Sequence, residues 1–508
     1  MILNKCFIPV LLFFMLVNFG QAQQTAIGSI SENDLRKHVS FLAADSLQGR
    51  KLGTPGLEIA AGYLRSETKK AGLKSVTPNY FQHFDLISTQ PDMENSFLKI
   101  PGAGNYLTDS LVCINQKNKL LKISGEVVFA GFGYQDEKNG YDDLEGVEID
   151  GKIVVCSTGS PKMFKKNSSF SWKNQLEQKK TERLFEKGAL AVVFVTNPKD
   201  STNRAFKQIY TWKNRERYSL KPDTVSADKK IFVTIPEFAN HLLGEKNGWK
   251  SYLTEIAGQN KPAPGYPENS SIEIQSSQFI KIHETQNVVG MLEGSHPELK
   301  NECVVYMAHY DHLGTDSEGN IYNGADDNAS GCAALLEIAK IFQQPEFQPA
   351  RSILFLWVTG EETGLLGSGY YANHPVFPIK NTVACINLDM IGRVYEPRDS
   401  VWKNSPKLVK DFDGIYTLVS DFNPKLVQLT DSVSKELGFI PDKSLPGYFF
   451  RSSDHYHFHS RNVPIVNLAT GYHADYHKVT DEESRIRYDK LKRITELSFW
   501  IGYKMAGN

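Results

Sequence analysis

The C-terminal half of the chain alternates short, nearly continuous apolar runs with longer amphipathic segments. The apolar runs lie at 303–308, 352–358 and 383–388. Runs of this length with few polar residues are typical of strands covered on both faces. Segments 329–342 and 491–505 have helical periodicity, and Thr480 with Glu483 forms a possible capping box for the second. The pattern predicts an α/β fold with a mixed, mostly parallel sheet flanked by helices.

The stretch from 100 to 260 has a different pattern. Short β-rich runs at 125–134, 152–157 and 189–195 alternate with clusters of Gly, Asp, Lys and Asn, and one amphipathic helix is expected at 177–187. This predicts a small, mostly β domain inserted into the α/β domain. A Pro-, Gly- and Ser-rich stretch, 261–277, is expected to connect the two. Residues 23–99, which include a helix over 57–72, and residues 261–508 then form the α/β domain.

The first 22 residues have the layout of a secretory signal peptide. Lys5 precedes an apolar run over 7–19, and small residues follow at Gly20 and Ala22. An uncleaved membrane anchor is the alternative, but it needs about 18 to 20 apolar residues, and this run is shorter. We therefore expect cleavage after Ala22, export to the periplasm or the medium, and no stable membrane span afterwards.

Composition and charge narrow the class of partner. The 508 residues are 41% hydrophobic and 23% charged, as in folded globular proteins. Lys plus Arg is 57 and Asp plus Glu is 58, so the net charge of -1 provides no electrostatic footprint for nucleic acid or an anionic membrane. Beyond residue 22 the chain has five cysteines among apolar neighbours, which suits buried small hydrophobic side chains and leaves any pairing open. Oligomeric state is left open as well.

Polar residues follow each predicted strand of the C-terminal half, where ligands bind in open α/β sheets. These residues, with those that flank the next helix and a later loop, are His309, Asp311, Asp326, Asp327, Glu361, Glu362, Asp389 and His477. Imidazole and carboxylate are the ligands that zinc prefers. His309 with Asp311 resembles a metal ligand and the carboxylate that orients it. Asp326 can turn toward metal while Asp327 or Asn328 caps the following helix.

The order of these motifs resembles the di-zinc exopeptidase family, which includes bacterial leucyl aminopeptidases, glutamate carboxypeptidases and glutaminyl cyclases. The motifs that carry the resemblance are FLAADSLQGR (41–50), AHYDHLG (308–314), NGADDNASG (323–331), GEETGLLGS (360–368), NLDMIGR (387–393) and DYH (475–477). The 100–260 insert is similar to a protease-associated domain. The resemblance implies a zinc exopeptidase fold and hydrolysis of peptide substrates.

The resemblance also assigns roles by position. It implies five ligands to two Zn²⁺ ions: His309, Asp326, Glu362, Asp389 and His477. Asp326 would bridge the ions, Glu361 would be the general base, and Asp311 would support His309 in catalysis. The ions would share the attacking water at a separation of about 3.5 to 4 Å. The family also has a cis peptide bond at the position that matches Asp326-Asp327.

Several alternatives stay open. Aminopeptidase activity leads, ahead of carboxypeptidase or dipeptidase activity, and glutaminyl cyclisation or non-catalytic binding is further behind. Another co-catalytic zinc family has similar H-x-D and Glu-Glu elements but lacks the NGADDNASG turn. The loop 451–455 belongs either to the substrate pocket or to ordinary polar surface. His455, His457 and His459 are expected not to bind metal, and the strand around 467–470 departs from the more aromatic strand usual in the family.

Overall fold

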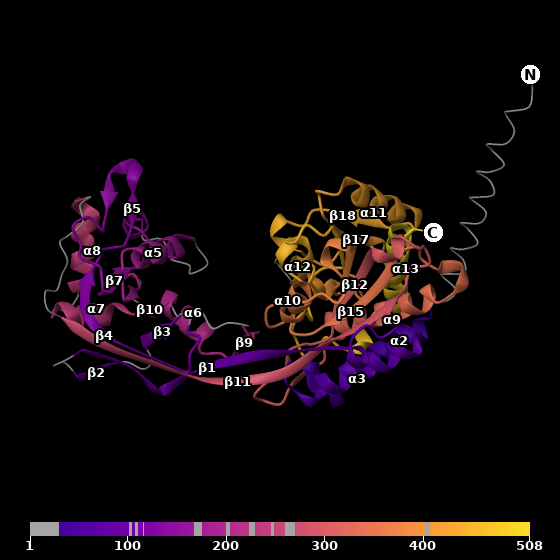
Figure 1. The fold of residues 1–508 in the computed structure, drawn as a ribbon, viewed down its shortest axis with the longest axis horizontal. Helices are drawn as coiled ribbons and strands as arrows, with labels where there is room; N and C mark the ends of the chain where they lie inside the picture. The colour runs from indigo at the N-terminus through magenta and orange to yellow at the C-terminus, as the bar shows by residue number, and fades with distance from the viewer. Residues whose placement is uncertain are drawn as a thin grey trace, which may run out of the picture. The chain divides into compact units, whose positions relative to one another are not determined.

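A computed structural model describes residues 30–507, apart from 101–103, 107–109, 115, 167–174, 200–203, 223–228, 245–247, 260–269 and 402–405. The predicted signal peptide lies outside the described residues. The described chain divides into two compact units (Figure 1). The first unit draws on Met1–Leu86 and His283–Asn508, and the second on Ile87–Ile282. None of the helices in the described part of the chain has the length and apolar character that a membrane crossing requires.

The boundaries between the units differ from those expected. Strands β1 (Phe81–Ile100) and β11 (Ser271–Leu292) each begin in one unit and end in the other. The expected boundary at residue 100 therefore coincides with the end of a long strand. The stretch 261–277, expected as a connector, belongs to β11 from Ser271 onward, and most of its earlier part lies outside the described residues. Its alternating residues Ile272 and Ile274 are buried, which is the strand pattern that its polar composition concealed.

In the first unit the strands of the sheet follow the order β18-β17-β19-β16-β12-β15-β11, which is one part of a 15-stranded sheet in the described chain. The strands of this part besides β11 are β12 (Cys303–His309), β15 (Ser352–Val358), β16 (Thr382–Leu388), β17 (Gly414–Val419), β18 (Ile440–Asp442) and β19 (Ile465–Ala469). Strands β19, β16, β12 and β15 are parallel, while β17 and β11 run antiparallel to their neighbours β19 and β15. The predicted mixed, mostly parallel sheet is confirmed.

Helices cover both faces of this sheet (Figure 1). They are α2 (Glu32–Leu42), α3 (Pro55–Lys70), α9 (Gly331–Phe342), α10 (Leu366–Asn373), α11 (Pro424–Glu436), α12 (Tyr456–His459) and α13 (Tyr488–Ala506). Because side chains alternate along a strand, Val305 and Met307 of β12 face α10 and α12. Tyr306 points the other way and donates its hydroxyl to Ser498 O of α13, 2.9 Å away.

The second unit is α/β and not mostly β as expected. Parallel strands β4 (Leu120–Phe129), β7 (Ile153–Ser157), β8 (Ala191–Val195) and β10 (Ile231–Thr234) lie side by side, with β3 (Leu111–Cys113) antiparallel at the edge. Its helices are α4 (Pro161–Lys165), α5 (Gln175–Glu186), α6 (Arg204–Lys213), α7 (Pro236–Leu243) and α8 (Gly248–Gln259). Val155 and Val154 of β7 belong to separate apolar clusters, so both faces of the sheet are buried.

Candidate metal centre

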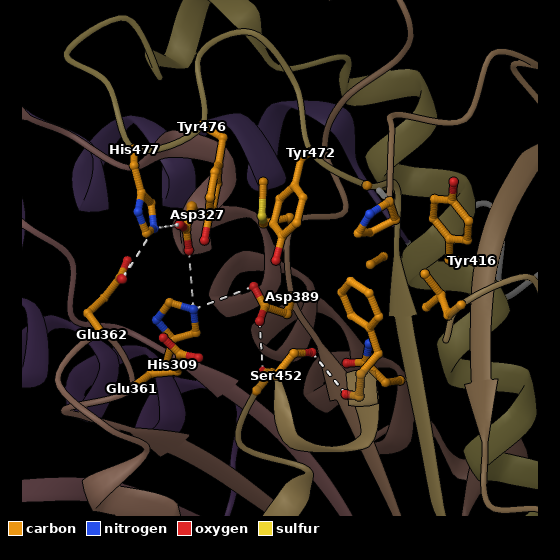
Figure 2. Close-up of a pocket in the computed structure, with 18 residues that line it drawn as sticks. His309, Asp327, Glu361, Glu362, Asp389, Tyr416, Ser452, Tyr472, Tyr476 and His477 are labelled. Atoms are coloured by element: carbon orange, nitrogen blue, oxygen red, sulfur yellow. Dashed lines mark hydrogen bonds and ion pairs between the residues drawn. The ribbon is translucent and has the colours of Figure 1, made fainter. Parts of the chain in front are cut away.

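The carboxyl ends of three parallel strands bring the predicted polar residues to one edge of the sheet. His309 is the last residue of β12 and is in register with Val358, the last residue of β15. Glu361 and Glu362 follow β15 after two intervening residues, and Asp389 directly follows β16. Parallel pairing makes these ends coincide, as open α/β sheets predict. His477 reaches the same place from a loop (Figure 2).

Asp327 is the carboxylate at the centre of the cluster. Its Oδ1 lies 3.3 Å from His309 Nε2, and its Oδ2 lies 3.2 Å from His477 Nε2. Asp389 Oδ1 completes the first side at 3.5 Å from His309 Nε2. Glu362 Oε2 completes the second at 3.3 Å from His477 Nε2. The two oxygens of Asp327 therefore face two separate sets of ligand-type atoms (Figure 2).

The structure corrects the predicted role of Asp326. This residue is fully buried, but its Oδ1 accepts from Gly392 N at 2.6 Å and its Oδ2 faces His473 Nε2 at 3.3 Å. Its side chain thus turns away from His309 and His477, and the shared carboxylate is Asp327. The cis peptide bond lies between Asp327 and Asn328, one residue later than expected. Two adjacent acids in an irregular turn point in different directions, and their order in the sequence does not reveal which one faces the strand ends.

His312 is a member of the cluster that sequence reasoning missed. Its Nδ1 lies 2.7 Å from Glu362 Oε1 and 3.8 Å from Asp327 Oδ2. Glu362 therefore stands between two imidazoles, with His312 at Oε1 and His477 at Oε2. His312 directly follows Asp311 and lies three residues beyond the end of β12, and that position was the only sign of its role in the sequence.

Asp311 holds the two loops after β12 and β15 together. Its Oδ1 accepts from Glu361 N at 3.2 Å and its Oδ2 from Glu362 N at 3.3 Å. His309 Nδ1 lies 3.2 Å from the Asp311 carbonyl oxygen and 3.8 Å from its Oδ1. Asp311 thus lies where it can orient His309, as expected, and it also fixes the backbone of Glu361 and Glu362.

Arg50 ties the motif at 41–50 to the same loops. The guanidinium is buried and donates to four backbone carbonyls, those of Leu42, Tyr310, Asn323 and Gly324. Gly324 has φ +57, and a Cβ there would lie 2.2 Å from Asp327 O, so this position requires glycine. The loop that follows His309 and the turn that carries Asp327 are therefore joined by one side chain.

The negative charge of the clustered carboxylates favours bound cations. Burial raises the pKa of Glu361 well above its ordinary value, and the neighbouring carboxylate of Glu362 adds to the rise. Burial opposes charge on His309 and His477 as well, yet carboxylates raise the pKa of His309 well above its usual range and that of His477 to about 10. Four buried or half-buried carboxylates within reach of each other and of imidazole nitrogens suit divalent zinc. The residues present fit two such ions, with Asp327 common to both.

A partly open cavity lies over the cluster. Beyond the ligand-type residues, its walls are largely apolar and aromatic and include Met390, Tyr416, Leu445, Phe449, Ala469, Tyr472 and Tyr476. Ser452 and Ser453, from the loop expected near the substrate pocket, also line it, and Ser453 Oγ donates to Asp389 Oδ2 at 2.7 Å. A pocket with apolar walls beside a metal-binding cluster suits one side chain of a bound substrate.

The remaining sequence-predicted positions lie elsewhere. His455 Nε2 contacts Phe449 O at 3.0 Å, and His459 Nδ1 contacts Ser420 Oγ at 3.0 Å. His457 and His459 belong to the short helix α12. Thr480 does not cap the last helix, which begins at Tyr488, and its hydroxyl donates to Asp475 Oδ1 at 2.6 Å. None of the five cysteines beyond residue 22 forms a disulfide.

Comparison with known proteins supports a family. Residues 287–500 match Peptidase family M28. Aminopeptidase YwaD of Bacillus subtilis (strain 168) is 26% identical over 221 residues, which are 42% of this chain and 43% of that protein. Leupeptin-inactivating enzyme 1 of Streptomyces exfoliatus is 29% identical over 163 residues, 32% of each chain. The matched segments span less than half the length of these relatives.

Similarity of fold extends further along the chain. The structure of an aminopeptidase from Aneurinibacillus sp. strain AM-1 matches with a TM-score of 0.53 at 17% identity, over 96% of each chain. Similarity at this identity shows the fold alone, and the likeness of the second unit to a protease-associated domain stays a prediction. The family match over residues 287–500, the confirmed sheet and the clustered side chains agree, and this part of the chain is similar to Peptidase family M28.

Proposed function

We propose that the protein is an exported, zinc-dependent aminopeptidase. The observation that carries the proposal is the position of Asp327, whose two carboxylate oxygens face different imidazole and carboxylate partners. In this arrangement His309 and Asp389 would hold one ion, Glu362 and His477 would hold the other, and Asp327 would contribute to both sites. Two zinc ions so held would polarise a peptide carbonyl and lower the pKa of a bound water.

Glu361 is the proposed general base. Its backbone is fixed by Asp311, and its carboxyl lies in the cavity wall beside His309 (Figure 2). It is the one acidic residue of the pair 361–362 without an imidazole partner at hydrogen-bond distance among the described residues. Its carboxylate is therefore free to take a proton from the attacking water and deliver it to the leaving amine.

The polarity of cleavage and the route of export rest on different grounds. The names of two similar proteins, from Bacillus subtilis and Aneurinibacillus sp. strain AM-1, include aminopeptidase activity, which supports a free amino end in the substrate. The charge and apolar pattern of residues 1–22 supports export and removal of that segment. N-terminal sequencing of the secreted protein should begin at Gln23; a retained Met1 would reject cleavage.

One assay tests the activity and its polarity together. Purified protein is incubated with a set of peptides that are free, blocked at the amino end, or blocked at the carboxyl end. We expect hydrolysis of the first and third only, loss of it in a chelator, and recovery with zinc. Cleavage of amino-blocked peptides would instead favour carboxypeptidase activity. Absence of hydrolysis from the zinc-loaded protein would reject the proposal.

A further inference from the structure

One polar side chain interrupts the apolar part of the cavity wall. Asn467 lies in the middle of β19, lines the cavity and is only 6% exposed. Apolar residues that line the same cavity include Ala469 of the same strand, Met390 and Phe449. A buried amide in such a wall costs free energy unless its polar atoms find partners, so the direction in which its N–H groups point is informative.

A chain of hydrogen bonds that begins at Asp389 fixes that direction. The Asp389 carboxylate is an acceptor, so Ser453 Oγ donates to it at 2.7 Å. Ser453 Oγ must then accept, and it does so from Asn387 Nδ2 at 3.0 Å. The same Asn387 nitrogen lies 2.8 Å from Asn467 Oδ1 and donates its second hydrogen there.

The two ends of the Asn467 amide are therefore distinct. Its oxygen accepts from Asn387 inside the protein, and its Nδ2 has no acceptor among the described residues. Since the residue lines the cavity, this amide presents an N–H donor to whatever fills the space beside Asp389. An apolar side chain at this position could not form a hydrogen bond with a polar group of a ligand.

We infer that Asn467 selects the residue at the cleaved end of the substrate, favouring a neutral side chain with an apolar stem and a terminal hydrogen-bond acceptor, of which glutamine is the fitting standard residue. The inference rests on the proposed function. The stem lies against the apolar wall, and the carboxamide oxygen accepts from Asn467 Nδ2. An aliphatic side chain of equal length fills the same space but leaves that donor unpaired.

Charge excludes the acidic counterpart of glutamine. Glu361, which holds no ion in the proposed arrangement, lines the same cavity and keeps its negative charge there as the proposed general base. A glutamate side chain would bring a further negative charge toward this group with little water to screen it. We therefore expect glutamine to be preferred over both leucine and glutamate.

The test compares L-glutamine, L-leucine and L-glutamate p-nitroanilides with the zinc-loaded full chain and its Asn467→Leu variant. The wild type should cleave the glutamine substrate at least as efficiently as the leucine substrate, and the glutamate substrate worst. In Asn467→Leu the glutamine-to-leucine ratio of kcat/KM should fall by about ten- to a hundredfold. Asn467→Ser, which keeps a short hydroxyl donor, should retain an intermediate ratio and serves if the leucine variant does not fold.

Ala469→Val is the matched control for a change of shape. It narrows the same wall without altering its polarity, so it should reduce turnover of the glutamine and leucine substrates alike and preserve their ratio. A ratio that stays unchanged in Asn467→Leu would overturn the inference and leave aminopeptidase activity intact. Failure of the wild type to cleave any of the three substrates would reject the proposed function instead.

Binding of the free amino acids decides the inference independently of turnover. Calorimetric titration of the zinc-loaded wild type should show tighter binding of L-glutamine than of L-norleucine, and Asn467→Leu should reverse the order. Equal binding of the two ligands by the wild type would overturn the role of Asn467, whether or not the protein hydrolyses peptides.

Discussion

Replacement of Asp327 by asparagine should weaken both metal sites at once. Each carboxylate oxygen faces a separate set of ligands, so the variant removes one ligand from each ion. The free energy of zinc binding at a four-ligand site is about 12 kcal/mol, or about 3 kcal/mol per ligand. The loss therefore corresponds to about a hundredfold weaker affinity at each site. Variants of Asp389 or His477 should weaken only one.

Asp326→Asn is the matched control because the two residues are adjacent and equally acidic. Its Oδ1 can still accept from Gly392 N, so this variant should keep two zinc ions per chain. Zinc content after dialysis against a weak chelator, measured by atomic absorption, distinguishes the two. Two retained ions in Asp327→Asn, or fewer than one in a folded Asp326→Asn, would refute the assignment of the shared carboxylate.

Four further results are expected. Glu361→Gln should retain zinc and lower kcat by about 10² to 10⁴; activity above a few per cent of wild type would exclude it as the base. His477→Ala should release one ion, whereas His312→Ala should keep both with about ten- to a hundredfold weaker affinity in a chelator competition; equal losses would show that both histidines bind metal. Arg50→Met should lower the urea stability of the first unit by about 3 to 5 kcal/mol, and a loss below about 1 kcal/mol would contradict its role as a clamp. Burial raises the pKa of Asp143 from 3.8 to about 6, so the folded second unit binds the carboxyl proton of Asp143 more firmly than the unfolded chain does. The free energy of unfolding of this unit should therefore fall as the pH rises through that interval. Thermal denaturation at several pH values should show a weaker dependence of stability on pH in Asp143→Asn than in the wild type.

The sheet of the first unit could be predicted because its strands are buried on both faces. The runs 303–308, 352–358 and 383–388 became β12, β15 and β16 with shifts of at most one residue. Strand β11 was missed from 271 to 277 because it alternates polar and apolar residues in a segment rich in turn-forming ones. In the second unit, the helices α6, α7 and α8 were missed, so the alternation of helices with parallel strands went unrecognised.

The candidate site was predictable where a side chain directly continues a strand. His309 and Asp389 follow from the ends of β12 and β16, because parallel pairing aligns those ends. Asp327 could not be chosen over Asp326 in this way, since both lie in a turn whose backbone is irregular. His312 was missed for a related reason: it lies beyond the strand end, and its contact with Glu362 depends on how two loops approach each other.

Arg50 shows why an early motif without evident chemistry belongs to a metal site. Its guanidinium joins Leu42 in the N-terminal segment to Tyr310 after β12 and to Asn323 and Gly324 before α9. Those carbonyls lie up to 274 positions away in sequence and on opposite sides of the inserted unit. The loops that carry His309 and Asp327 are therefore held by a residue that precedes the second unit in the chain. The geometry of the candidate ligands consequently depends on the packing of this N-terminal segment against the rest of the first unit.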